Sequence, residues 1–290
     1  MRAPCSPGRD GAWRATSSRE RWSWSPSSRA RPRGRCRSMR SWLALSATGL
    51  LLSGCVLVEW IGGPAPASKP ALDADLVQRG AALFADRRLS GDGTRSCASC
   101  HPGGGEDRKV YLDGESVEPG TPGGLRTPSL RGLWQTAPYL WDGSATTLRA
   151  ATDRMLALEM RGGSLSGRDA DALESYLLSL APFDRGRIQP DGAPVEPVNL
   201  TARKGFAVFA EAGCADCHPA PAFARARTSD VGTGGRFSVP TLRGVATRGP
   251  WGHDGRFADL ESAVRAVAAG SGVELGSDQM SQLLAYLALL

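Results

Sequence analysis

The sequence predicts an all-α fold of two tandem domains related by internal duplication. Short motifs recur at one constant offset along the chain: "TPSLRG" (127–132) matches "VPTLRG" (239–244), and "APYLWDG" (137–143) matches "GPWGHDG" (249–255). Amphipathic helical patterns also recur between Gly/Pro-rich loops, and runs of β-branched residues are few. The repeated unit is of an ordinary domain size.

The helical segments of the two halves match each other. "RGAALF" (79–84) matches "KGFAVF" (204–209), and "ALESYLLSL" (172–180) matches "QLLAYLALL" (282–290). In the second pair, apolar residues lie at i, i+3, i+4 and i+7, which is one face of a helix. These faces are Leu173, Tyr176, Leu177 and Leu180 in the first half, and Leu283, Tyr286, Leu287 and Leu290 in the second.

The basic charge of the chain lies in the N-terminal segment 1–54. This segment holds 11 arginines but only Asp10 and Glu20, whereas the rest of the chain holds 24 Lys and Arg against 27 Asp and Glu. The net charge of +6 therefore comes from this segment. The mildly acidic remainder gives no reason to expect nucleic-acid binding.

A secretory signal pattern follows a second methionine, Met39. A positively charged residue and the apolar run 42–52 lead to "LSGC", which ends at Cys55. This motif is similar to a bacterial lipobox, which implies a lipid on Cys55 and a periplasmic protein held at a membrane. The apolar run is too short for a membrane span of about 20 residues. We expect translation to start at Met39.

These patterns divide the chain into five parts. Pro-, Ala- and Gly-rich composition marks a tether after Cys55 and a linker between the two halves. The predicted parts are a spurious N-terminal extension plus lipoprotein signal peptide (1–54), a tether (55–72), a first domain (73–182), a linker (183–200) and a second domain (201–290).

Each domain contains one CxxCH motif, "SCASCH" (96–101) and "GCADCHP" (213–219). All four cysteines beyond Cys55, and two of the three histidines, lie in these motifs. Two cysteines on one helical turn can form thioethers to the porphyrin vinyl groups, and the next histidine then faces the iron. We therefore expect two cytochrome c-like domains with two covalently bound haem c groups. The predicted attachment residues are Cys97, Cys100, Cys214 and Cys217, and the predicted iron ligands are His101 and His218.

Other interpretations of CxxC fit less well. Zinc needs four ligands per site, and four cysteines with three histidines cannot fill two sites without carboxylates. A redox-active CxxC needs a βαβ context, which the sequence lacks. A disulfide across three residues leaves the adjacent histidine without a role.

The sixth ligand of each iron has its own candidates. Met155 follows Trp141 in the first half and is a candidate for the first iron, whereas the matching position in the second half is Val267. His253 is a candidate sixth ligand of the second iron, although a hydrogen-bonded core or propionate contact is the commoner role of such a histidine. Met280, in the last amphipathic helix, is expected in the core.

From residue 79 to residue 290 the chain resembles the bacterial di-haem cytochrome c peroxidase and MauG family. The resemblance rests on "LFADRRLSGDGTRSCASCH", "TPSLRGLWQTAPYLWDGSATTL" and "VPTLRGVATRGPWGHDGRFADL". It implies a protein that reduces peroxide, or uses it to oxidise a substrate, with electrons passed between the haems and a redox partner protein. The family often holds calcium between its domains, but no acidic cluster in the sequence indicates ligands for it.

The resemblance also implies roles for single residues. Trp141 matches a tryptophan that relays electrons between the haems. Glu159, followed by Met160, resembles a Glu-Met pair whose glutamate is the acid–base at the peroxide-reactive haem, where a proton must move between the peroxide oxygens. Met155 competes with this role, because a first iron ligated by methionine could not bind peroxide.

The chain departs from the family pattern in two places. No histidine lies between His101 and His218, so the histidine that blocks the reactive iron in the family's peroxidases has no counterpart. The methionine that ligates the second haem in these peroxidases is replaced by Val267. Because methionine ligation raises the potential of a haem, the reduction potential of the second haem should be lower here. Both departures resemble the MauG-like branch. The alternative is a non-catalytic periplasmic di-haem electron-transfer protein.

Overall fold

The computed structural model describes residues 14–16, 21–23, 69–165 and 167–290. The chain divides into two compact units, Met1–Gly62 and Gly63–Leu290. In the first unit, β1 (Arg14–Thr16) pairs antiparallel with β2 (Arg21–Ser23). The predicted signal segment and Cys55 lie outside the described residues. Within the described ranges, no helix is long and apolar enough to cross a membrane.

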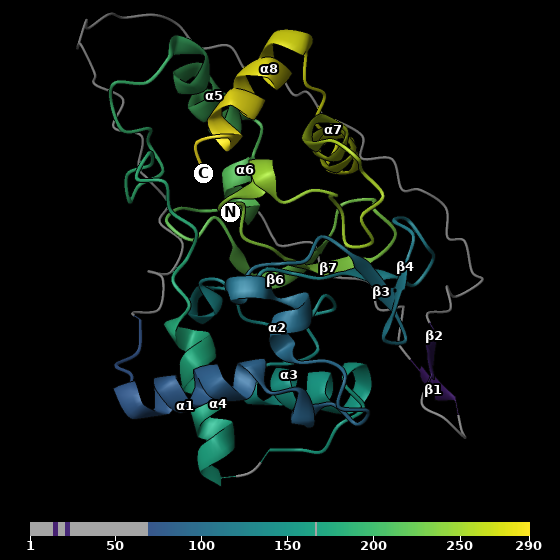
Figure 1. Cartoon of the computed structure of the whole chain (residues 1–290). Helices are drawn as coiled ribbons and strands as arrows, with labels where there is room; N and C mark the ends of the chain where they lie inside the picture. The colour runs from purple at the N-terminus through teal and green to yellow at the C-terminus, as the bar shows by residue number, and fades with distance from the viewer. Residues whose placement is uncertain (1–13, 17–20, 24–68, 166) are drawn as a thin grey trace, which may run out of the picture. The chain divides into compact units, whose positions relative to one another are not determined.

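Helices dominate the unit Gly63–Leu290 (Figure 1). The first half contains α1 (Ala74–Ala85), α2 (Cys97–Cys100), α3 (Leu148–Arg154), the π-helical turn η4 (Met155–Glu159) and α4 (Gly167–Ser179). The second half contains α5 (Leu200–Glu211), α6 (Cys214–Cys217), α7 (Leu260–Gly270) and α8 (Ser277–Leu287). Short 3-10 turns lie at η1 (Arg87–Leu89), η2 (Pro102–Gly104), η3 (Leu133–Gln135) and η5 (Val245–Thr247).

The first helix of each half begins at a polar side chain that caps its free backbone N–H groups. Asp73 accepts hydrogen bonds from the N–H groups of Asp75 and Leu76 at the start of α1. Asn199 accepts one from the N–H of Ala202 at 2.7 Å at the start of α5. Such caps stabilise a helix by roughly 1 kcal/mol, so the sequence fixes where both helices begin.

The long loops contain short antiparallel strands, so the all-α prediction is wrong in these loops. The fold is helical with few strands. Strands this short do not show the apolar alternation by which strands are recognised in a sequence. In the first half β3 (Val110–Leu112) pairs with β4 (Glu115–Val117) and β5 (Leu125–Arg126), and in the second half β6 (Arg225–Asp230) pairs with β7 (Arg236–Val239).

Each half has its own hydrophobic core. In the first half, Phe84 of α1 packs with Leu173 and Leu177 of α4. In the second half, α5 packs against α8 in the same way, as Figure 1 shows. The predicted apolar faces of the helices are confirmed, since the buried residues of this second core include Val208, Phe209, Leu283, Tyr286, Leu287 and Leu290.

The helices of each pair meet at a glycine. A Cβ atom at Gly80 of α1 would lie 2.0 Å from the carbonyl oxygen of Ala172 in α4. A Cβ atom at Gly205 of α5 would lie 1.9 Å from the carbonyl oxygen of Gln282 in α8. Only glycine lacks Cβ, so both helix pairs depend on it for their close approach.

Backbone hydrogen bonds join the two halves reciprocally. The N–H of Arg126 donates to the carbonyl of His253 at 2.6 Å, and the N–H of Ser238 donates to the carbonyl of Trp141 at 2.7 Å. Arg126 and Ser238 hold matching positions in the two halves, as do Trp141 and His253, because both pairs share the offset of the repeated motifs. The residues just before the two matched Pro-containing motifs therefore make equivalent contacts across the interface.

Candidate functional site

The two CxxC pairs lie on the one-turn helices α2 and α6. All four thiols are free. Burial raises the pKa of Cys97 to about 11 and that of Cys214 to about 11. Reactive redox thiols need a lowered pKa, so these sites do not favour a redox-active CxxC.

The histidine after each pair is oriented for metal binding. Nδ1 of His101 lies 3.1 Å from the carbonyl oxygen of Gly105, and Nδ1 of His218 lies 3.0 Å from that of Phe223. A carbonyl oxygen can only accept, so Nδ1 carries the hydrogen and Nε2 keeps its lone pair. Burial lowers the pKa of both rings, that of His218 to about 4. Both are therefore neutral, the form that binds metals.

The structure brings the Glu159–Met160 pair to the first motif. The sulfur of Met160 lies 3.9 Å from Sγ of Cys97, and the charge of Glu159 acts on Cys100. Burial raises the pKa of Glu159, and Asp113 raises it further. A carboxyl with a raised pKa can both take up and release protons. Among the described residues, no hydrogen bond joins the Met155 side chain to this motif.

Trp141 and His253 meet at the interface of the two halves. Nε1–H of Trp141 donates to the carbonyl of Arg126 at 2.6 Å. The ring of His253 stacks on Phe237 at 3.8 Å between centroids and 18° between planes. The Trp141 ring lies edge-on to both, with centroids 6.4 Å away in each case. The three rings form one group, to which the second half contributes two.

Charged side chains at the same interface carry buried atoms that have no hydrogen-bond partner, although Arg126 also donates to the Arg248 carbonyl through Nη1. Glu106 and Arg126 have side chains that are 6% and 9% exposed. Oε1 of Glu106 lies 4.0 Å from Arg126 and 3.7 Å from Arg248, beyond hydrogen-bond distance. The Nε atoms of both arginines and Nε1 of Trp134 are also buried and unpartnered. Such groups are costly to leave unpaired, so they point to an anionic or hydrogen-bonding group that completes the site.

These observations fit haem. Four free cysteines, two neutral histidines and buried donors without acceptors match the vinyl groups, iron and propionates of a porphyrin. Calcium has no such support: among residues 69–165 and 167–290, no three His, Cys, Asp or Glu residues cluster closely enough to hold an ion.

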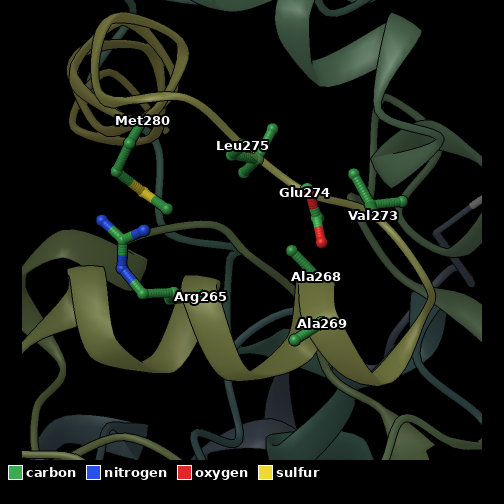
Figure 2. Close-up of a pocket in the computed structure, with 7 residues that line it drawn as sticks. All are labelled: Arg265, Ala268, Ala269, Val273, Glu274, Leu275 and Met280. Atoms are coloured by element: carbon green, nitrogen blue, oxygen red, sulfur yellow. The ribbon is translucent and has the colours of Figure 1, made fainter.

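A cavity of about 280 Å³ lies between α7 and α8. Figure 2 shows the side chains of Met280 and Arg265 extending toward each other across it. Arg265, Ala268 and Ala269 line it from one face of α7, whereas Val267 lies on the opposite face by helical periodicity. Met280 is buried in the core, as predicted.

The sequence interpretation missed several polar residues of the site. Tyr111 donates its hydroxyl hydrogen to Asp107 at 2.6 Å beside Cys100. Glu106, Arg126 and Arg248 were not singled out either. Arg126 directly precedes "TPSLRG" and Arg248 closely follows "VPTLRG", so charged residues beside these repeated apolar motifs were the available signal.

The comparisons with known proteins agree with the geometry. The family model of di-haem cytochrome c peroxidase matches residues 74–177. The methylamine utilization protein MauG of Methylorubrum extorquens is 32% identical over 69% of this chain and 70% of the relative. The cytochrome c551 peroxidase of Nitrosomonas europaea is 25% identical over 74% of this chain and 79% of the relative.

Solved structures share the fold. The hydrazine synthase of Kuenenia stuttgartiensis superposes with a TM-score of 0.63 at 21% identity, covering 89% of this chain and all of that one. The diheme peroxidase BthA of Burkholderia thailandensis superposes with a TM-score of 0.57 at 18% identity, covering 75% of this chain and 86% of that one.

Proposed function

Because this chain belongs to the di-haem cytochrome c peroxidase and MauG family and is a haem peroxidase-type oxidoreductase, we propose that its first haem site reacts with peroxide and that the second supplies electrons. The observation that carries this is the pair His101 and His218, each half-buried directly after a CxxC pair with Nδ1 held by a backbone carbonyl. Cys97 and Cys100 would hold the first haem c covalently, and Cys214 and Cys217 would hold the second.

Haem, when bound, supplies the redox chemistry of peroxide reduction. Glu159 takes a proton from one peroxide oxygen and returns it to the other, which then leaves as water. Its burial beside the first motif supports this role. Trp141 relays electrons between the halves, which its position among rings of the second half supports. Arg126, Arg248 and Trp134 would bind propionates with their unpartnered N–H groups.

The sixth ligands remain proposals. Met155 is the candidate at the first iron, and Glu159 needs that position open for peroxide. His253 is the candidate at the second iron, although its stacking on Phe237 supports the contact role instead. The electron-transfer alternative would require Met155 to bind iron, and the position of Glu159 favours the enzyme.

The proposal also includes an internal duplication of the domain and a periplasmic location. The matched glycines Gly80 and Gly205 and the reciprocal bonds across the interface support an internal duplication, with domains at 73–182 and 201–290. We place the protein in the periplasm, anchored through lipid on Cys55, with a redox protein as electron donor or substrate. Calcium between the domains is the least supported part.

The attachment sites are tested by intact mass spectrometry of protein matured with haem. We expect the mass of two haems on the wild-type chain, and the mass of one on the Cys97→Ser/Cys100→Ser variant and on the Cys214→Ser/Cys217→Ser variant. The first variant should also lose peroxide turnover entirely. A wild-type chain without covalent haem would contradict the proposal.

Asp113→Asn should move the pH profile of turnover. Asp113 raises the pKa of Glu159 because its negative charge disfavours a second one. Asparagine tolerates the left-handed backbone of Asp113, whose φ is 52°. Removing the charge lowers the pKa of Glu159. In a plot of kcat/KM against pH, the rise that accompanies deprotonation of Glu159 therefore moves to lower pH. The exposed Glu115, changed to Gln, serves as control, and a move to higher pH in Asp113→Asn would contradict the assignment.

A further inference from the structure

A positive charge lies directly beside the second CxxCH motif. Nη2 of Arg227 is 2.7 Å from Sγ of Cys217. Its charge also reaches His218, whose pKa it helps to lower. No carboxylate forms an ion pair with Arg227 in the part of the chain that the structure describes. The motif also contains Asp216, whose charge acts on Cys214, so the positive charge of Arg227 lies at the Cys217 end of the motif.

An irregularity in the β6–β7 pairing places Arg227 there. Between Arg225 and Thr228, β6 holds two residues for which β7 offers no partner, and Arg227 is one of them. Extra residues in a strand bend it and re-aim side chains, often next to active sites. In the first half, β3 pairs with β5 residue by residue. The second half thus has a local feature that its counterpart lacks.

The first motif has charges of both signs near it, and none of its cysteine sulfurs contacts a guanidinium among the hydrogen bonds of the described residues. Asp107 and Glu159 both act on Cys100. The nearby Arg95 lies 3.9 Å from Asp92 and 4.0 Å from Glu115, so acidic groups balance its charge. The second motif therefore differs from the first in having a guanidinium at hydrogen-bond distance from one of its cysteine sulfurs.

We propose that Arg227 is a positioning residue that raises the reduction potential of the second haem through its positive charge at Cys217. Reduction removes one positive charge from the haem, so a fixed cation beside it stabilises the reduced form. This effect opposes the lowering expected from Val267. The inference rests on the proposed function, because it needs both haems in place.

The test is a spectroelectrochemical titration of the full holoprotein, with the first haem as internal reference. In Arg227→Gln, we expect the second haem to shift about tenfold toward its oxidised form, which is about 59 mV for one electron. Arg227→Lys keeps the charge and should keep most of the potential. The matched control is Arg236→Gln, which removes a charge from the same hairpin but from a guanidinium that contacts the Thr228 carbonyl. Arg227 is exposed, so added salt should reduce the difference in second-haem potential between the wild type and Arg227→Gln.

Equal shifts in Arg227→Gln and Arg236→Gln, or a second haem whose potential rises in Arg227→Gln, would overturn the inference. If the wild type carries both haems and turns over peroxide while Arg227→Gln leaves the potentials unchanged, only this inference fails. A wild-type chain without haem at Cys217 would overturn the proposed function as well.

Discussion

Replacing Glu159 by Gln is expected to lower peroxide turnover by roughly 100- to 10,000-fold, the usual contribution of a general acid–base. Glutamine keeps the size of the side chain but cannot accept and return a proton. The half-buried carboxyl lies near enough to Cys100 for its charge to act there, and its raised pKa makes it a stronger base toward the first proton of peroxide. The loss should appear in kcat/KM for peroxide, measured by stopped-flow absorbance.

The control for this variant is Glu115→Gln. Glu115 lies on β4 of the same half, but its side chain is 74% exposed, so its replacement should leave turnover close to that of the wild type. Haem content and unfolding temperature must stay unchanged in both variants. Equal turnover in Glu159→Gln and the wild type would remove Glu159 from the mechanism and leave the electron-transfer alternative in its place.

Gly205→Ala is expected to destabilise the protein strongly. The new Cβ would lie 1.9 Å from the backbone carbonyl oxygen of Gln282 and 2.8 Å from Cβ of Tyr286, so α5 and α8 must separate. Overpacking of this kind costs about 3 kcal/mol, which for a unit of this size lowers the unfolding temperature by about 6–12 °C. Differential scanning calorimetry of the holoprotein measures the shift.

Gly163→Ala is the matched control, because nothing lies within 4 Å of a Cβ placed there. It should melt within a degree or two of the wild type, since surface substitutions usually change stability by less than about 0.5 kcal/mol. Gly80→Ala should behave like Gly205→Ala, since its Cβ would lie 2.0 Å from the Ala172 carbonyl oxygen. If Gly205→Ala melted like Gly163→Ala, the close helix contact would be wrong.

The helical framework could be predicted because its signals are local. The apolar spacing in "ALESYLLSL" and "QLLAYLALL" reports which face of each helix is buried, and the structure buries that face. The strands β3 to β7 carried no such pattern, because they are short and are held by pairing with other segments of the chain. Sequence periodicity cannot register such pairing.

The site residues also fall into those that the sequence reveals and those that only the fold brings together. The CxxCH motifs could be recognised because the cysteines and the histidine are adjacent in sequence. The cluster of Glu106, Arg126 and Arg248 could not, because two of these residues come from one half and the third from the other. The contact of Arg227 with Cys217 depends on an irregular strand pairing, and no spacing rule reports where such an irregularity aims a side chain.

The account's central claim is that the first haem site is open and reacts with peroxide. The most direct test is electron paramagnetic resonance of the oxidised full-length holoprotein, before and after one equivalent of peroxide. The account predicts a high-spin ferric signal that disappears on addition of peroxide in the wild type and persists far longer in Glu159→Gln. Two low-spin signals that peroxide leaves unchanged would contradict the claim, because both irons would then hold protein ligands on both sides.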